Sequence, residues 1–167
     1  MSMQRYAIFL SGPIGAGKTT LGRALATRVG GSFIDGDDHA DPDLPWYGSI
    51  LCTSRSVVRE GFSLLAERPY LVVAYPLRCS DWIFFRRHFG DDGVRPIFVS
   101  LRASYERIVD AGRGRVFDTE EHDRIRVMLA EGYGERGFSD LIVDTDRESF
   151  AETLDELETK LSGFMAA

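Results

Sequence analysis

The sequence predicts an α/β fold in which helices flank a five-stranded parallel sheet, giving three layers. Short apolar runs alternate along the chain with longer segments whose apolar residues recur at helical spacing. The run at 69–74 is continuously apolar, which is typical of a strand buried on both faces of a parallel sheet. The run at 6–10 enters a helix through a glycine-rich turn. Strands are expected at 6–10, 32–34, 69–74, 96–101 and 140–143.

Helices are expected between these strands and after the last one, with right-handed crossovers. Asp118, with Glu121 three residues later, predicts a helix start, and Thr145 with Glu148 predicts the start of the final helix. The expected helices lie at about 18–29, 50–67, 81–89 and 104–110, after Asp118, and through Phe150, Leu154, Leu157 and Leu161.

The turn Gly12–Thr19 fits the phosphate-binding pattern G-x-x-x-x-G-K-[ST] at every fixed position. Glycine allows consecutive backbone N–H groups to surround an anion, and the helix that follows adds its positive end. Lys18 is expected to reach the β- and γ-phosphates of ATP, and Thr19 to place its hydroxyl on Mg²⁺. An ordinary glycine-rich turn would explain the glycines but not Lys18-Thr19 at this offset. The expected ATP-binding residues are Gly12, Gly15, Ala16, Gly17, Lys18, Thr19 and Thr20.

Asp35 and Asp37 directly follow the second expected strand. Ligands of parallel α/β sheets bind beyond the carboxyl ends of the strands, so both carboxylates are expected near the phosphate loop. One is expected to hold Mg²⁺ through water, and the other to accept a proton or a hydrogen bond from an acceptor hydroxyl. Which aspartate has which role stays open, and Asp35 is taken as the metal candidate with Thr19. The alternative is a solvated acidic turn.

A small acceptor-binding region is expected at about 37–65. Arg55 and Arg59 lie four residues apart on one face of the expected helix, where either can hold an anionic substrate by a forked contact. A solvent-exposed helix surface explains the same pair. His39 is a candidate substrate contact, with a polar turn as the alternative.

A lid is expected at about 111–120, where the chain reads Gly112-Arg113-Gly114-Arg115. A mobile arginine there can neutralise charge on a transferring phosphoryl group and help to exclude water. The alternative is a basic loop without a ligand.

The whole chain, 1–167, is expected to form one soluble domain, because 44% of its residues are hydrophobic and 28% are charged. The net charge of −6 argues against nucleic acid as a partner. No apolar run approaches membrane-spanning length. Cys52 and Cys79 form no metal or redox spacing, so a reduced cytoplasmic setting is expected. The expected state is a monomer or a homodimer.

The residues resemble shikimate kinases and gluconokinases, in the nucleoside-monophosphate-kinase-like branch of the P-loop NTPases. The resemblance rests on Gly12–Thr19, on 33–37, on the segment near Arg113 and on 141–146. It implies that Lys18 and Thr19 serve ATP and Mg²⁺, that Asp35 and Asp37 serve the metal and the acceptor, that Arg55 lies near a substrate-carboxylate arginine, and that Arg113 or Arg115 is the lid arginine. Shikimate kinases carry Gly-Gly-Gly after the third strand, whereas this chain reads Ala74-Tyr75-Pro76-Leu77.

The expected function is ATP-dependent transfer of the γ-phosphoryl group to a hydroxyl of a small polar, anionic metabolite. Lys18, Asp35, Asp37, Arg113 and Arg115 are the expected catalytic residues. Two alternatives stay open: a nucleoside monophosphate kinase, which needs more arginines around its acceptor, and an ATP-binding module without catalysis.

Overall fold

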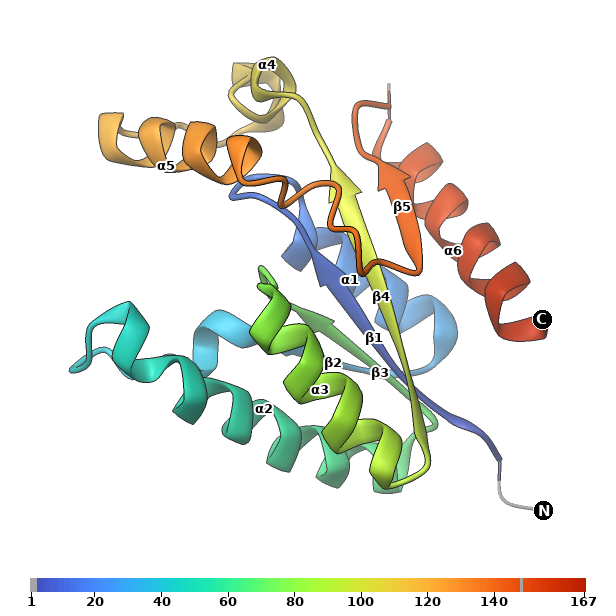
Figure 1. Cartoon of the computed structure of the whole chain (residues 1–167). Helices are drawn as coiled ribbons and strands as arrows, with labels where there is room; N and C mark the ends of the chain where they lie inside the picture. The colour runs from blue at the N-terminus through green and yellow to red at the C-terminus, as the bar shows by residue number, and fades with distance from the viewer. Residues whose placement is uncertain (1–2, 148) are drawn as a thin grey trace.

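The computed structural model describes residues 3–147 and 149–167 and places one parallel sheet between layers of helices (Figure 1). The strands are β1 (Arg5–Ser11), β2 (Ser32–Asp35), β3 (Tyr70–Ala74), β4 (Val94–Arg102) and β5 (Leu141–Asp144). They stand in the order β2-β3-β1-β4-β5, and every neighbouring pair is parallel. The predicted fold class is confirmed.

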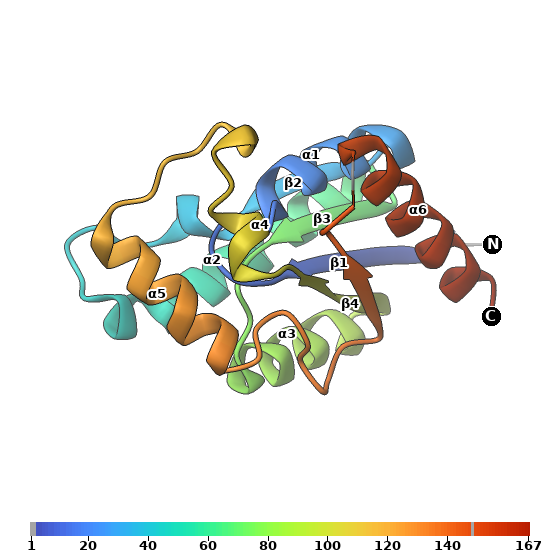
Figure 2. The same ribbon diagram turned by 90° about the horizontal axis from the view of Figure 1, so that it is seen from above.

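The helices are α1 (Lys18–Val29), α2 (Trp46–Glu67), α3 (Cys79–Asp91), α4 (Tyr105–Ile108), α5 (Thr119–Ala130) and α6 (Phe150–Ala166). Two short 3₁₀ helices, η1 (Gly36–His39) and η2 (Ala111–Arg113), follow β2 and α4. No helix in the described ranges is long and apolar enough to span a membrane. Figure 2 shows α1 and α6 on one side of the sheet and α3 on the other.

The alternating side chains of the central strand build two apolar cores. Ile8 of β1 packs in the same cluster as Leu25 of α1 and Leu157 of α6, whereas Phe9 packs in a second cluster with Phe85 of α3. The Phe9 and Phe85 rings are stacked with centroids 4.8 Å apart. Because successive strand residues point to opposite faces, one buried strand anchors both helical layers. The carboxyl ends of the strands thereby stay free for the loops, with α4 and α5 beyond them (Figure 1).

Several element boundaries differ from the prediction: α2 begins four residues earlier than expected, and α3 and β4 are one or two residues longer at each end. Two further differences have a local reason. The helix expected at 104–110 is limited to α4, because the Asp110 backbone, with φ −59° and ψ 121°, is not helical and its side chain accepts a hydrogen bond from Gly112 N to begin η2. The final helix begins at Phe150, capped by Ser149 and Glu152 rather than by the predicted pair. The predicted cap residue Thr145 instead donates its hydroxyl to Arg102 O at 3.0 Å, and Glu148 lies outside the described residues.

Candidate active site

The phosphate loop joins β1 to α1 in a backbone shape that only glycine adopts freely. Gly15 has φ 78° and Gly17 has φ 94°, and Gly17 caps the start of α1. A Cβ on Gly15 would lie 2.7 Å from Ile108 Cγ2 and 2.9 Å from Phe117 Cζ, so the loop packs directly against α4 and the lid segment. The loop therefore needs glycine at this position both for its conformation and for its close contact.

Lys18 lies over the loop that precedes it. Its Nζ donates to Gly12 O at 3.0 Å and to Pro13 O at 2.7 Å. Burial lowers the pKa of Lys18 to about 8, an effect that Asp37 and Asp35 partly oppose and that Arg115 reinforces. The ammonium group is thus held by neutral carbonyl groups close to the cavity, where a phosphate anion can replace them as its partner.

Thr19 and Asp35 form a pair of oxygen donors beside the loop. Thr19 Oγ1 donates to Asp35 Oδ2 at 2.8 Å, and Asp35 Oδ1 accepts from Asp37 N at 3.1 Å. Mg²⁺ prefers hard oxygen ligands, keeps several waters and commonly takes only one or two protein oxygens beside a nucleotide's phosphates. This hydroxyl–carboxylate pair fits such an ion. Among residues 3–147 and 149–167 no group of three or more His, Cys, Asp or Glu side chains could hold a metal ion.

Asp37 faces a cavity of about 1040 Å³ above the carboxyl ends of the strands. Burial raises the pKa of its carboxyl group, the charge of Asp35 raises it further, and Lys18 and Arg124 oppose this. Ala40, Pro76, Arg124 and Met128 line the same cavity as Asp37.

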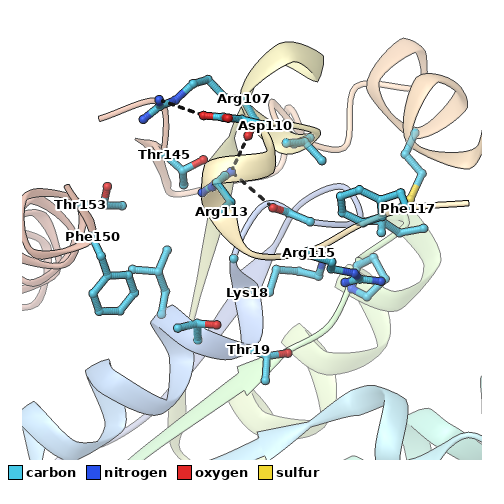
Figure 3. Close-up of a pocket in the computed structure, with 18 of the residues that line it drawn as sticks. Lys18, Thr19, Arg107, Asp110, Arg113, Arg115, Phe117, Thr145, Phe150 and Thr153 are labelled. Carbon is cyan, nitrogen blue, oxygen red and sulfur yellow. Dashed lines mark hydrogen bonds and ion pairs between the residues drawn. The ribbon is translucent and has the colours of Figure 1, made fainter. Parts of the chain in front are cut away.

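In Figure 3, Arg107, Thr145, Phe150 and Thr153 lie around the part of the cavity beside the phosphate loop. Phe150 supplies an aromatic ring and the two threonines supply hydroxyl groups. This composition suits the base and sugar of a nucleotide whose phosphates lie on the loop.

Both lid arginines line the cavity (Figure 3). Arg113 Nη1 donates to Gly15 O at 3.5 Å and to Arg107 O at 3.4 Å. Arg115 pairs with Glu121 at 2.9 Å, and its guanidinium lies 4.6 Å from the centre of the Phe117 ring. The structure therefore brings the lid arginines together with Lys18, Thr19 and Asp37, as the sequence predicts.

Three predicted substrate residues do not line this cavity. Arg55 and Arg59 are exposed on α2, two residues to either side of the buried Val57. Two residues correspond to about 200° around a helix, so both arginines lie nearly opposite the face that packs on the sheet. His39 is bound to α2 through both ring nitrogens, with Nδ1 2.7 Å from Ser56 Oγ and Nε2 2.8 Å from Glu60 Oε2.

The structure also shows cavity residues that the sequence did not single out. They are Arg107, Arg124, Arg147, Phe150 and Thr153. Phe150 and Thr153 belong to the first turns of α6, whose predicted start was wrong. The sequence signal for Arg124 is its i, i+4 spacing to the buried Met128, which places both residues on one face of α5.

A glycine-rich phosphate loop after the first strand, a five-stranded parallel sheet and a cavity over the loop define a P-loop protein of the small-kinase type. Solved structures share this fold. A gluconokinase from Sinorhizobium meliloti 1021 superposes with a TM-score of 0.66 at 21% identity, covering 99% of this chain and 100% of that chain. A shikimate kinase from Acinetobacter baumannii, solved in complex with shikimate, has a TM-score of 0.64 at 20% identity, covering 95% and 94%.

Curated sequences identify the family. A shikimate kinase from Halorhodospira halophila is 49% identical over 83% of each protein. Other shikimate kinases match a shorter part, so the chain spans about a quarter of their length; that of Psychrobacter cryohalolentis is 48% identical over 44 residues, 24% of each. No protein-family model matches the chain. By the match to the Halorhodospira enzyme the chain belongs to the shikimate kinase family.

Proposed function

We propose that the protein transfers the γ-phosphoryl group of ATP to a hydroxyl of a small, polar, anionic metabolite. The observation that carries the proposal is that one cavity is lined by the phosphate-loop Lys18, by Thr19 and by Asp37, and that the Thr19 hydroxyl donates to Asp35 beside it. These residues supply a phosphate cradle, a magnesium position and a proton acceptor, the main parts of a phosphoryl-transfer site.

The arrangement supports one division of roles between the two aspartates. Asp35 is engaged by Thr19, so we assign it to Mg²⁺, through water or directly. Asp37 lines the cavity and has a raised pKa, so we assign it to the acceptor hydroxyl, whose proton it takes as the oxygen bonds to phosphorus and the bond to ADP breaks. When bound, Mg²⁺ would neutralise charge on the phosphates.

Positive charge over the transferring group comes from Lys18 and from the lid. Removing one such charged donor typically costs about 10²–10³ in turnover. Arg113 has only long contacts to two carbonyl oxygens, and Arg115 is held by the surface residue Glu121. Either guanidinium can move to a phosphate oxygen without breaking a strong bond.

We also propose that the protein acts in the cytoplasm, where the free thiols Cys52 and Cys79 stay reduced.

The test is ADP formation from ATP and Mg²⁺ with gluconate, shikimate, glucose and AMP as acceptors. Lys18→Ala is expected to lower turnover by about 10²–10³. Lys160→Ala is the matched control, because Lys160 lies on α6 and pairs with Glu156. Unchanged turnover in Lys18→Ala would rule out this mechanism. Turnover with AMP alone would favour a nucleoside monophosphate kinase, and tight ATP binding without transfer to any acceptor would favour a non-catalytic module.

A further inference from the structure

Asp37 belongs to a turn that is too short to hold its shape by itself. The 3₁₀ helix η1 has only the four residues Gly36–His39, and 3₁₀ turns have poor hydrogen-bond geometry. None of these residues has an apolar side chain that could anchor the turn in a core. Asp37 and Asp38 are exposed, whereas the His39 side chain is only 16% exposed. The position of Asp37 therefore depends on contacts between η1 and the rest of the protein.

His39 connects this turn to α2 by three polar contacts. Its Nδ1 lies 2.7 Å from Ser56 Oγ, and its Nε2 lies 2.8 Å from Glu60 Oε2. Its carbonyl oxygen accepts a hydrogen bond from Thr53 Oγ1 at 3.2 Å. Ser56 and Glu60 follow Thr53 by three and seven residues, so the three side chains form one stripe along α2. The side chain and the backbone of His39 are thus held by the same face of one helix.

The donors and acceptors of the His39 ring match those of its partners. An ionised carboxylate only accepts hydrogen bonds, so the Nε2 atom that faces Glu60 carries a proton. Nδ1 then accepts a hydrogen bond from Ser56 Oγ when the ring is neutral and donates one when the ring is charged, because a hydroxyl group can do either. Both ring nitrogens are used in either state, so neither is left for a substrate.

The contacts of His39 lie on a continuous path from the core of the protein to Asp37. On the side of α2, Val57 is fully buried and packs in the same apolar cluster as Phe9 of the central strand. On the side of η1, Ala40 N donates to Asp37 O at 3.2 Å, which closes the turn that contains His39. A side chain that is fixed at both of its ends in this way can hold a neighbouring functional group in place.

We propose that His39 is a positioning residue, which holds η1 against α2 and thereby sets the place of the Asp37 carboxylate relative to the phosphate loop. The inference rests on the proposed function, in which Asp37 takes the proton of the acceptor hydroxyl. It replaces the substrate contact that the sequence predicted for His39. Misplacing a catalytic group by about 1 Å lowers turnover by about 10²-fold, so loss of His39 should act on kcat. ATP binding should not depend on His39, because Lys18 is held by the phosphate loop itself.

The test measures kcat, KM for ATP and KM for the acceptor of the panel that is phosphorylated fastest, at a temperature well below the Tm of each variant. His39→Ala is expected to lower kcat about 10- to 100-fold and to leave KM for ATP unchanged. The amide of His39→Asn can replace Nδ1 and that of His39→Gln can replace Nε2, so each variant should keep one contact and recover part of kcat. Ser56→Ala and Glu60→Ala should each lower kcat less, and neither should lower it further in the His39→Ala background. His88→Ala is the matched control, because His88 is exposed on α3 and its ring bonds Phe84 O of the same helix.

Three outcomes would overturn the inference. They are a wild-type kcat in His39→Ala, a rise of KM for the acceptor at unchanged kcat, which is the mark of a substrate contact, and additive losses when Ser56→Ala or Glu60→Ala is combined with His39→Ala. In each of these cases transfer that depends on Lys18 would still support the kinase function. If His39→Ala does not fold, a full wild-type kcat in both His39→Asn and His39→Gln overturns the inference instead. If the wild type transfers a phosphoryl group to no acceptor of the panel, the proposed function and this inference both fail.

Discussion

Gly36 lies between the two aspartates of the site, and its replacement tests how closely Asp37 is positioned. The backbone of Gly36 is not in the left-handed region, so its requirement is one of space. An added Cβ would lie 2.3 Å from Cδ2, 2.7 Å from Cγ and 2.9 Å from Cβ of Tyr75. The Tyr75 ring therefore packs directly on the backbone that carries Asp37.

The size of the effect follows from these distances. Non-bonded carbons approach to about 3.5 Å, so the ring edge would have to retreat by about 1.2 Å and the Tyr75 Cβ by about 0.6 Å. Rotating the side chain cannot move Cβ, so either η1 or the turn after β3 must shift. Overpacking of this kind costs about 1–3 kcal/mol of stability. A displacement of Asp37 by about 1 Å is enough to lower turnover about 10²-fold.

The assay combines urea unfolding with the rate of phosphoryl transfer. Gly36→Ala should lose stability and turnover together, and Tyr75→Ala should restore part of both in the double variant, because it removes two of the three short contacts. Gly163→Ala on α6 is the control: no atom lies within 4 Å of its added Cβ, so it should stabilise the helix by about 0.5–1 kcal/mol. Wild-type behaviour of Gly36→Ala, or strictly additive losses in the double variant, would refute the reasoning.

Three further predictions concern protonation and capping. Burial lowers the pKa of Lys18 to about 8 in the free protein, and a bound phosphate raises that pKa, so nucleotide affinity should fall as pH rises above about 8. Titration calorimetry in two buffers of different ionisation enthalpy should detect proton uptake when the nucleotide binds. Lys18→Arg should show no such uptake. Burial and Asp35 raise the pKa of Asp37, so the ionised carboxylate destabilises the fold at neutral pH. Asp37→Asn should therefore raise Tm, by about 2–4 °C for each kcal/mol of destabilisation that it removes, and should abolish turnover. The gain in Tm should disappear below the ordinary carboxyl pKa, where Asp37 is protonated in the folded and unfolded states alike. Ser149→Ala should cost about 1 kcal/mol in urea unfolding, and an unchanged midpoint would contradict the observed cap of α6.

Short sequence patterns predicted correctly those helix ends that are decided by contacts between residues close together in the chain. Asp118 and Glu121 were predicted as a cap, and their reciprocal hydrogen bonds of 2.8 and 3.1 Å begin α5. Thr145 failed as a cap because its backbone N–H continues the pairing toward Arg102 O at 2.8 Å, and its hydroxyl bonds the same oxygen. A contact between distant strands decided that boundary, and no short sequence window contains it.

The same distinction explains which of the predicted residues the structure brings together. Lys18, Thr19 and the aspartates follow strands directly, so the parallel sheet alone brings them together. Arg55 and Arg59 depend on the rotation of α2, and the apolar pattern around Val57 already placed that pair on the opposite face. Arg124 lines the cavity because α5 lies beside it, and no short sequence window shows that placement.

The free structure gives the cations of the site weak partners that nucleotide binding can replace. Lys18 is held by two carbonyl groups, Arg113 by long contacts, and Arg115 by an exposed pair with Glu121, a class of interaction worth about 0–1 kcal/mol. Glu121 also accepts from Asp118 N to cap α5, so α5 keeps its start when Arg115 leaves. We therefore expect the lid to rearrange at low cost.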